Sequence, residues 1–118
     1  MIVLRLPLPP SLNHYYGKTK TGDLYLTADG RRYRDIVKWT AKGQSVGESN
    51  VRMDVIMAMP NKGRRDVDNY LKCLFDALTK AKVYADDKQV FDLHVIKMLD
   101  PEKKGFFMVM IDEYNGGW

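Results

Sequence analysis

One amphipathic segment constrains the fold of this chain more than any other feature of its 118 residues. Between residues 66 and 82, four large apolar side chains recur at the i, i+3, i+4, i+7 spacing of one helical face, which predicts a helix. These side chains are Leu71, Leu74, Phe75 and Leu78. Alternating apolar residues in segments 51–59 and 89–98, before and after it, predict strands. A helix between two strands requires a sheet on which its apolar face can pack.

The remaining segments complete a β-α-β-α-β-β order. Residues 2–6 alternate and predict a first strand, which the prolines after it end. A first helix begins at Thr27-Ala28-Asp29-Gly30, because apolar residues at helical spacing follow this entry. Residues 106–112 predict a last strand, joined to the strand at 89–98 by a hairpin loop at 100–105. The connection at 9–26 shows no clear structure, which is typical of functional or mobile segments.

These elements predict an α+β fold. We expect one four-stranded sheet, mixed or antiparallel because its last two strands form a hairpin, with the two main helices packed on it. A chain of this length suits a single domain, spanning residues 1–118.

The composition excludes several classes of protein. The single cysteine, Cys73, rules out an internal disulfide and is typical of a reducing cytosol. One cysteine and two histidines are too few for a zinc finger. No apolar run is long enough to cross a bilayer, and the first residues predict a strand rather than a signal peptide. The glycine-rich loops that bind nucleotides are not present, so we expect no nucleotide cofactor. The reducing cytosol that Cys73 indicates leads us to expect a cytoplasmic location.

Charge is unevenly distributed along the chain. Residues 1–65 carry 12 Lys/Arg against 5 Asp/Glu, a net of +7, whereas residues 66–118 carry 7 against 10, a net of −3. A basic part can bind a polyanion while an acidic part collects cations. Ordinary scatter of surface charge is the alternative, but the two signs meet at residues 64–68.

The segment Arg64-Arg65-Asp66-Val67-Asp68-Asn69 joins two chemistries at the start of the second helix. Paired carboxylates suit Mg²⁺, and guanidinium groups match phosphate oxygens. Lys72 follows one turn after Asp68 on the same polar face. Helix capping is the simpler explanation for either aspartate alone. Taken together, the residues predict half of a metal site that acts on a polyanion.

A second acidic pair, Asp86-Asp87, follows the same helix. A helix of this length ends about 25 Å from its start, so the pair must return to reach Asp66. It does so if the strand at 89–98 begins beside the end of the strand at 51–59. The alternative for this pair is a solvated acidic turn.

Three motifs resemble the RusA family of Holliday junction resolvases. They are PPSLNHYY at 9–16, TADGRRYRD at 27–35 and RRDVDNYLKCLFDALTKAKVYADDKQV at 64–90. The motifs follow in the family's order and cover nearly the whole chain, as one RusA-like endonuclease domain. The family consists of small endonucleases, often from phages and prophages. The resemblance implies a homodimer that binds four-way junction DNA and makes paired symmetric nicks with Mg²⁺, for which Mn²⁺ substitutes.

The resemblance also implies roles for individual residues. The family's metal carboxylates fall on Asp66, Asp68 and Asp87, and its important lysine falls on Lys72; whether Asp86 or Asp87 coordinates stays open. Further polar positions of the family, which are candidates for binding DNA, match Arg64, Arg65, Asn69 and Asn13.

Other basic residues are candidates for contacts to the DNA backbone, although an ordinary solvated surface explains any one of them as well. They are Arg31, Arg32, Arg34 and Lys38 in the first helix and Lys18 and Lys20 before it. Tyr15 and Tyr16 are expected either to stack on unpaired bases or to cover the core.

We therefore expect a Mg²⁺-dependent endonuclease that resolves four-way junctions in DNA recombination and repair. Two alternatives stand beside this expectation. One is a non-catalytic nucleic-acid-binding module whose aspartates only cap the helix. The other is a metal-dependent nuclease that acts on other branched DNA.

Overall fold

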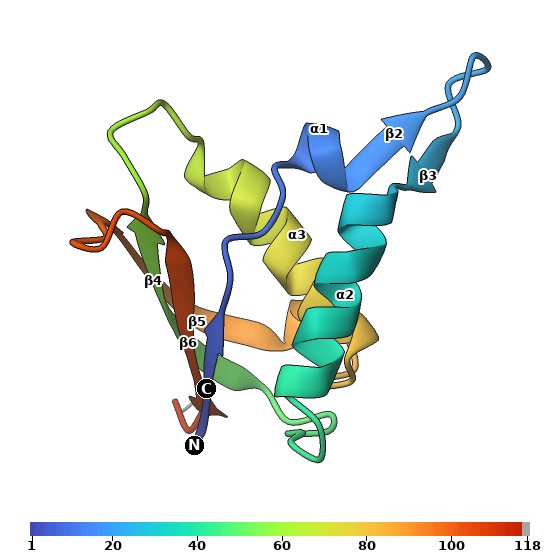
Figure 1. The fold of residues 1–118 in the computed structure, drawn as a ribbon. Coiled ribbons are helices and arrows are strands. Elements are labelled where there is room, and N and C mark those ends of the chain that lie inside the picture. Colours follow the sequence, from blue (N-terminus) through green and yellow to red (C-terminus); the bar gives the residue numbers. More distant parts are fainter. Residues whose placement is uncertain (117–118) are drawn as a thin grey trace.

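A four-stranded mixed sheet carries the main helices on one face (Figure 1). The computed structural model describes residues 1–116. The sheet order is β1-β6-β4-β5. Its strands are β1 (Ile2–Leu6), β4 (Val51–Met59), β5 (Val90–Leu99) and β6 (Phe106–Glu113). The helices on it are α2 (Ala28–Thr40) and α3 (Val67–Lys80), so the predicted α+β class is confirmed. Among residues 1–116, no helix has the length and apolar character needed to cross a membrane.

The core lies between the sheet and the two main helices. In β4 every second residue, from Val51 to Met59, is at most 2% exposed, as its alternation predicts. From α3, Leu74 and Leu78 are fully buried together with Cys73 and Ala77. Leu71 and Phe75, which the periodicity also assigned to the core stripe, are only partly buried at its flank. The side of helix α3 that carries Leu71 and Phe75 is therefore only partly covered by the rest of the molecule.

Strand β5 is parallel to β4 and does not form a hairpin with β6. The register pairs Val51 with Val90 and Met59 with Leu99, whereas β6 runs antiparallel between β1 and β4. The predicted hairpin at 100–105 is therefore wrong. Helix α3 returns across the sheet, so β5 starts at the same end as β4 and takes its outer edge. For the same reason β5 does not begin beside the end of β4, so the condition under which Asp87 would reach Asp66 within one chain is not met.

The connection at 9–26, expected to lack structure, contains three short elements. They are α1 (Leu12–Tyr15), β2 (Tyr16–Lys18) and β3 (Leu24–Leu26), and the two strands form an antiparallel hairpin. The hairpin projects from the body of the molecule (Figure 1). Helix α2 begins directly after it, as predicted, because the Thr27 hydroxyl accepts a hydrogen bond from the Gly30 amide at 3.0 Å.

One polar cluster joins α1, α2 and α3. The Arg34 side chain meets the Asp76 carboxylate through Nε at 2.9 Å and through Nη2 at 2.8 Å. The Tyr15 hydroxyl donates to the same carboxylate and accepts from Arg34 Nε at 3.1 Å. Burial and the bond to Asp76 raise the pKa of Tyr15, so its hydroxyl remains a donor. The charged side chains are about a quarter exposed, so loss of one leaves the other poorly solvated.

Replacement of Asp76 tests how much this cluster contributes. Asp76→Ala leaves the Arg34 guanidinium and the Tyr15 hydroxyl without their shared acceptor, and should lower the free energy of unfolding by about 2 kcal/mol. Arg32→Ala is the matched control, since Arg32 forms an exposed ion pair with Asp29 on the same helix as Arg34 and should change stability by less than about 0.5 kcal/mol. Urea unfolding measures both. Equal effects of the two substitutions would contradict a special role for the cluster.

Candidate metal site and nucleic-acid surface

Asp66 and Asp68 lie together at the exposed start of α3. Asp66 occupies the N-cap position with extended backbone angles, φ −78° and ψ 125°, but its side chain makes no capping hydrogen bond. The capping explanation therefore does not account for this carboxylate. Asp68 lies in the first turn, where the helix dipole favours a negative charge. Both aspartates are exposed, so the pair is accessible to a cation.

Lys72 lies on α3 between the two groups of acidic residues. It is exposed and one turn beyond Asp68, as predicted. It also lines a shallow pocket of about 240 Å³ at the other end of the helix. The other residues of this pocket are Asp76, Thr79, Lys80, Asp86 and Asp87. The Lys72 ammonium can therefore act beside the Asp66–Asp68 pair or beside the Asp86–Asp87 pair.

Asp86 and Asp87 have different roles although they are neighbours. The Asp86 carboxylate accepts the Lys88 amide at 2.9 Å and caps the short 3-10 helix η1 (Asp87–Gln89). The Gln89 side chain accepts the Asp86 amide at 2.8 Å in return, and the bond from Lys88 lowers the pKa of Asp86. Partial burial and the carboxylates of Asp86 and Asp76 raise the pKa of Asp87. Asp86 is thus used in capping, and Asp87 is the better candidate for a ligand.

The two acidic groups lie at opposite ends of α3. Its 14 residues span about 20 Å, and Asp87 follows its C-terminal end. The N-terminal end lies by the far end of β5, because Lys97 Nζ donates to the Arg65 carbonyl at 2.9 Å. Within residues 1–116, no three His, Cys, Asp or Glu side chains form a group that could hold a metal. The expected closure of the three carboxylates does not occur inside one chain.

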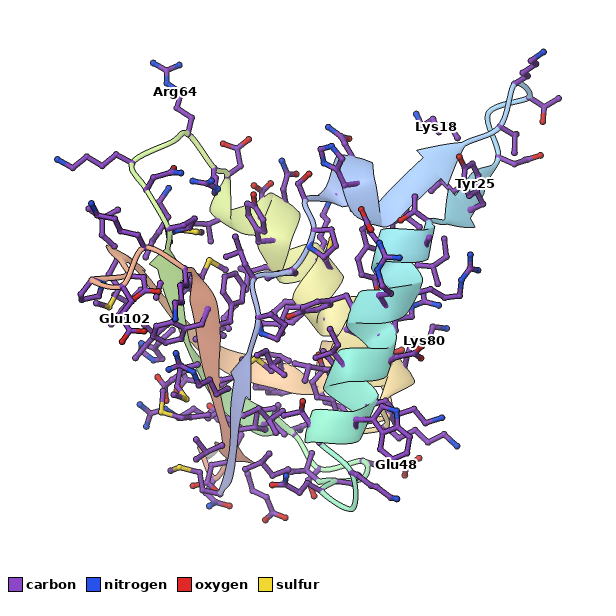
Figure 2. All side chains as sticks on the ribbon, in the orientation of Figure 1. Lys18, Tyr25, Glu48, Arg64, Lys80 and Glu102 are labelled. Atoms are coloured by element: carbon purple, nitrogen blue, oxygen red, sulfur yellow. The ribbon has the colours of Figure 1, made fainter. Side chains whose placement is uncertain are left out.

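The arginines before Asp66 differ in their surroundings. Arg64 is exposed and points away from the body of the molecule (Figure 2). Arg65 is half-buried, and its Nη1 donates to the Asn61 amide oxygen at 2.8 Å. Asn69 is partly buried in the first turn of α3, whereas Asn13 is exposed in α1. Of the side chains next to Asp66 and Asp68, Arg64 is therefore the one most open to a ligand.

The basic residues of α2 and the hairpin are also not equivalent. Arg34 is committed to Asp76 and Tyr15, so it is unsuited to the DNA contact expected of it. The other five candidates are exposed: Lys18, Lys20, Arg31, Arg32 and Lys38.

The aromatic residues near the N-terminus also differ in their exposure to solvent. Tyr15 is 0% exposed and belongs to the core, as one of its two expected roles required. Tyr25, which the sequence did not single out, is 52% exposed on the hairpin. The feature that sets Tyr25 apart is its position opposite Gly17 in the hairpin. This pairing is known only from the strand register.

Comparison with known proteins decides the family. The family model described as Endodeoxyribonuclease RusA matches residues 7–109. The chain belongs to the RusA endodeoxyribonuclease family. RusA relatives named crossover junction endodeoxyribonucleases are similar over 105 residues, which are 86% of this chain and 85% of each relative. The relative from Enterobacteria phage 82 is 42% identical, and those from Shigella sonnei (strain Ss046) and Escherichia coli (strain K12) are 41% identical. The predicted family is therefore confirmed.

Substitutions of the neighbouring residues Asp86 and Asp87 are expected to have opposite effects on the stability of the metal-free protein. Because the folded-state pKa of Asp87 is raised, its ionisation opposes folding as the pH rises above the ordinary carboxyl range near 4. Asp87→Asn should therefore raise the melting temperature at pH 7 in EDTA, and the gain should vanish near pH 3. Asp86→Ala should lower the melting temperature at pH 7 because η1 loses its cap. If calorimetry at pH 7 shows that both substitutions shift the melting temperature in the same direction, the different roles assigned to Asp86 and Asp87 are contradicted.

Proposed function

We propose that this protein resolves four-way (Holliday) DNA junctions by paired symmetric nicks, in DNA recombination and repair. Family membership and the printed names of the relatives support this proposal. The observation that carries it in this chain is the uncapped Asp66 carboxylate beside Asp68, directly after two arginines. The phage relative supports a phage or prophage source, with activity in the cytoplasm of the host.

The residues at the start of α3 fit a hard divalent cation. Asp66 and Asp68 offer exposed carboxylate oxygens, which are the ligands that Mg²⁺ takes together with substrate phosphates. Mn²⁺ accepts the same donors and would substitute. Such a cation polarises the scissile phosphate and lowers the pKa of a bound water. Two carboxylates give an incomplete set, and Asp87 of the same chain is too distant to extend it.

We infer that Asp87 comes from a second copy of the chain. Strand β5 is at the edge of the sheet, and its helix-bearing side leaves Leu93 and Leu99 39% and 44% exposed. Antiparallel pairing of two β5 strands across a two-fold axis would put the start of one beside the end of the other. Because Asp87 precedes β5 and Lys97 ties the end of β5 to Arg65, each Asp87 would approach Asp66 of the other copy.

This homodimer would carry two sites related by symmetry, as paired nicks require. In each site the Lys72 ammonium would stabilise negative charge on the phosphate or orient the attacking water. Arg64 would hold the DNA backbone next to Asp66, and exposed basic residues of α2 would extend the contact away from the site. These contacts are to phosphates, so they favour DNA without reading its sequence.

Mixed dimers test both the site and its sharing between chains. Asp66→Asn and Asp87→Asn should each reduce Mg²⁺-dependent nicking of a synthetic four-way junction by more than about 100-fold, with junction binding largely kept. Dimers that combine the two variants should regain nicking, because one of their two sites contains no substitution. They should cut one strand rather than a symmetric pair, since their other site carries both.

The outcomes of this experiment separate the alternatives. Dimers of mixed variants that stay inactive would place all three carboxylates in one chain's site and overturn the sharing. Nicking by Asp66→Asn at the parental rate would overturn the metal site itself. Junction binding by the wild-type protein without any Mg²⁺-dependent nicking would favour the non-catalytic binding module. Faster cutting of a flapped or forked substrate would favour the nuclease on other branched DNA.

Lys72 gives a separate test of the chemistry. Lys72→Ala should lower the single-turnover rate by about 100-fold while changing the Kd for the junction by less than about 3-fold, because the ammonium acts on charge that develops in the reaction. Lys80→Ala is the matched control, since Lys80 is an exposed lysine of the same pocket. A loss of affinity with an unchanged rate would make Lys72 a DNA-binding residue instead.

A further inference from the structure

The β2–β3 hairpin carries an exposed aromatic side chain at a place where no core requires one. Tyr25 and Leu24 are 52% and 64% exposed, and Lys18 and Lys20 beside them are also exposed. Figure 2 shows Tyr25 and Lys18 on this projecting arm, away from the packed helices. Large apolar side chains gathered on a projection commonly mark a binding surface.

The Tyr25 ring packs over a glycine of the strand opposite. Tyr25 pairs with Gly17, and a Cβ atom added to Gly17 would lie 2.4 Å from Tyr25 Cζ. The ring therefore lies directly over the glycine backbone, in the space that any side chain at position 17 would fill. An aromatic residue packed over a cross-strand glycine also fixes the strand register. A ring that already packs on the backbone before binding loses less conformational freedom when it meets a ligand than a fully solvated ring does.

The hairpin is also fixed at its tip and its base. At the tip, the Thr19 amide donates to the Asp23 carbonyl at 2.9 Å and the Gly22 amide donates to the Thr19 carbonyl at 3.0 Å. At the base, the Thr27 amide and hydroxyl donate to the Tyr15 carbonyl at 3.1 and 2.9 Å. An isolated two-stranded hairpin is marginally stable, so these anchors let it act as a rigid arm.

We propose that this arm enters the branch point of a four-way junction and that Tyr25 stacks on a base exposed there. The inference rests on the proposed function. A continuous duplex hides its base faces in the stack, whereas the branch point interrupts the stack and exposes them. An aromatic ring stacks on any base, and Lys18 and Lys20 are suited to the phosphates on either side. In Figure 1 the arm and the start of α3 lie at the same end of the molecule.

This arrangement gives the protein a means to select branched DNA. Contacts from Arg64 or from the lysines are available on any duplex, because every duplex has phosphates. A stacking contact is available only where a base face is open. Tyr25 would therefore add affinity for the junction and none for the duplex, and would hold the branch point in a fixed position relative to the carboxylates.

Binding measurements in EDTA isolate this contact from catalysis. Tyr25→Leu should weaken binding to a four-way junction by about 5- to 100-fold and binding to a linear duplex by less than about 2-fold. Tyr25→Phe should keep the junction affinity, because the ring remains. Trp39→Leu is the matched control, because it removes an aromatic ring that is 70% exposed on α2, outside the arm, and it should bind both DNAs as the wild type does. A 2-aminopurine base at the branch point should change its fluorescence with wild type and Tyr25→Phe, but not with Tyr25→Leu.

Gly17→Ala tests the orientation of the ring without removing it. The added methyl group would displace the Tyr25 ring, so this variant should lose junction affinity like Tyr25→Leu while keeping the melting temperature of the body. Junction binding by Tyr25→Leu at the wild-type level would overturn the proposal, as would equal losses on junction and duplex. A wild-type protein that prefers junctions but does not nick them overturns only the proposed catalysis, so the two failures are distinguishable.

Discussion

The ion pair between Arg34 and Asp76 is the interaction on which the placement of both proposed functional regions depends. It joins the middle of α2 to the middle of α3, and the Tyr15 hydroxyl adds α1 to the same carboxylate. Tyr15 is followed directly by β2, so the cluster also fixes the base of the hairpin relative to α3. A partly buried ion pair contributes little net stability compared with apolar packing, but it is selective for one arrangement. Here that arrangement joins α2 and the residue before the hairpin to α3.

A second constraint follows from the electrostatics of carboxylates. Three aspartates that share one site repel each other until a cation arrives, and this repulsion raises their pKa values and opposes folding. In this chain α3 keeps Asp66 and Asp68 away from Asp87 by its own length. Each chain can therefore fold without the full repulsion. If the site forms between two copies, as we propose, that repulsion arises only on assembly, when metal and phosphate are available to offset it.

The features that were predictable from the sequence are those that depend on neighbouring residues. The alternation of β4, the Thr27 cap of α2 and the polar face of Lys72 are local patterns, and each is found as expected. The partner of β5 was not predictable in this way, because a strand chooses its neighbour through non-local packing. Arg34 shows the same limit: its sequence surroundings match those of Arg31 and Arg32, and only Asp76, 42 residues away, sets it apart.

The Asp86–Asp87 pair shows why the chemistry of a site depends on backbone geometry as well as on residue type. Both side chains are exposed and one residue apart, so composition and motif treat them alike. The turn into η1 directs amides at Asp86, which lowers its pKa and uses its oxygen atoms. It gives Asp87 no such amide partner, and the loss of solvent around Asp87 together with two nearby carboxylates raises its pKa. A carboxylate that opposes folding in this way is difficult to explain by stability alone, whereas a cation ligand requires an acidic oxygen that is not already used in a cap.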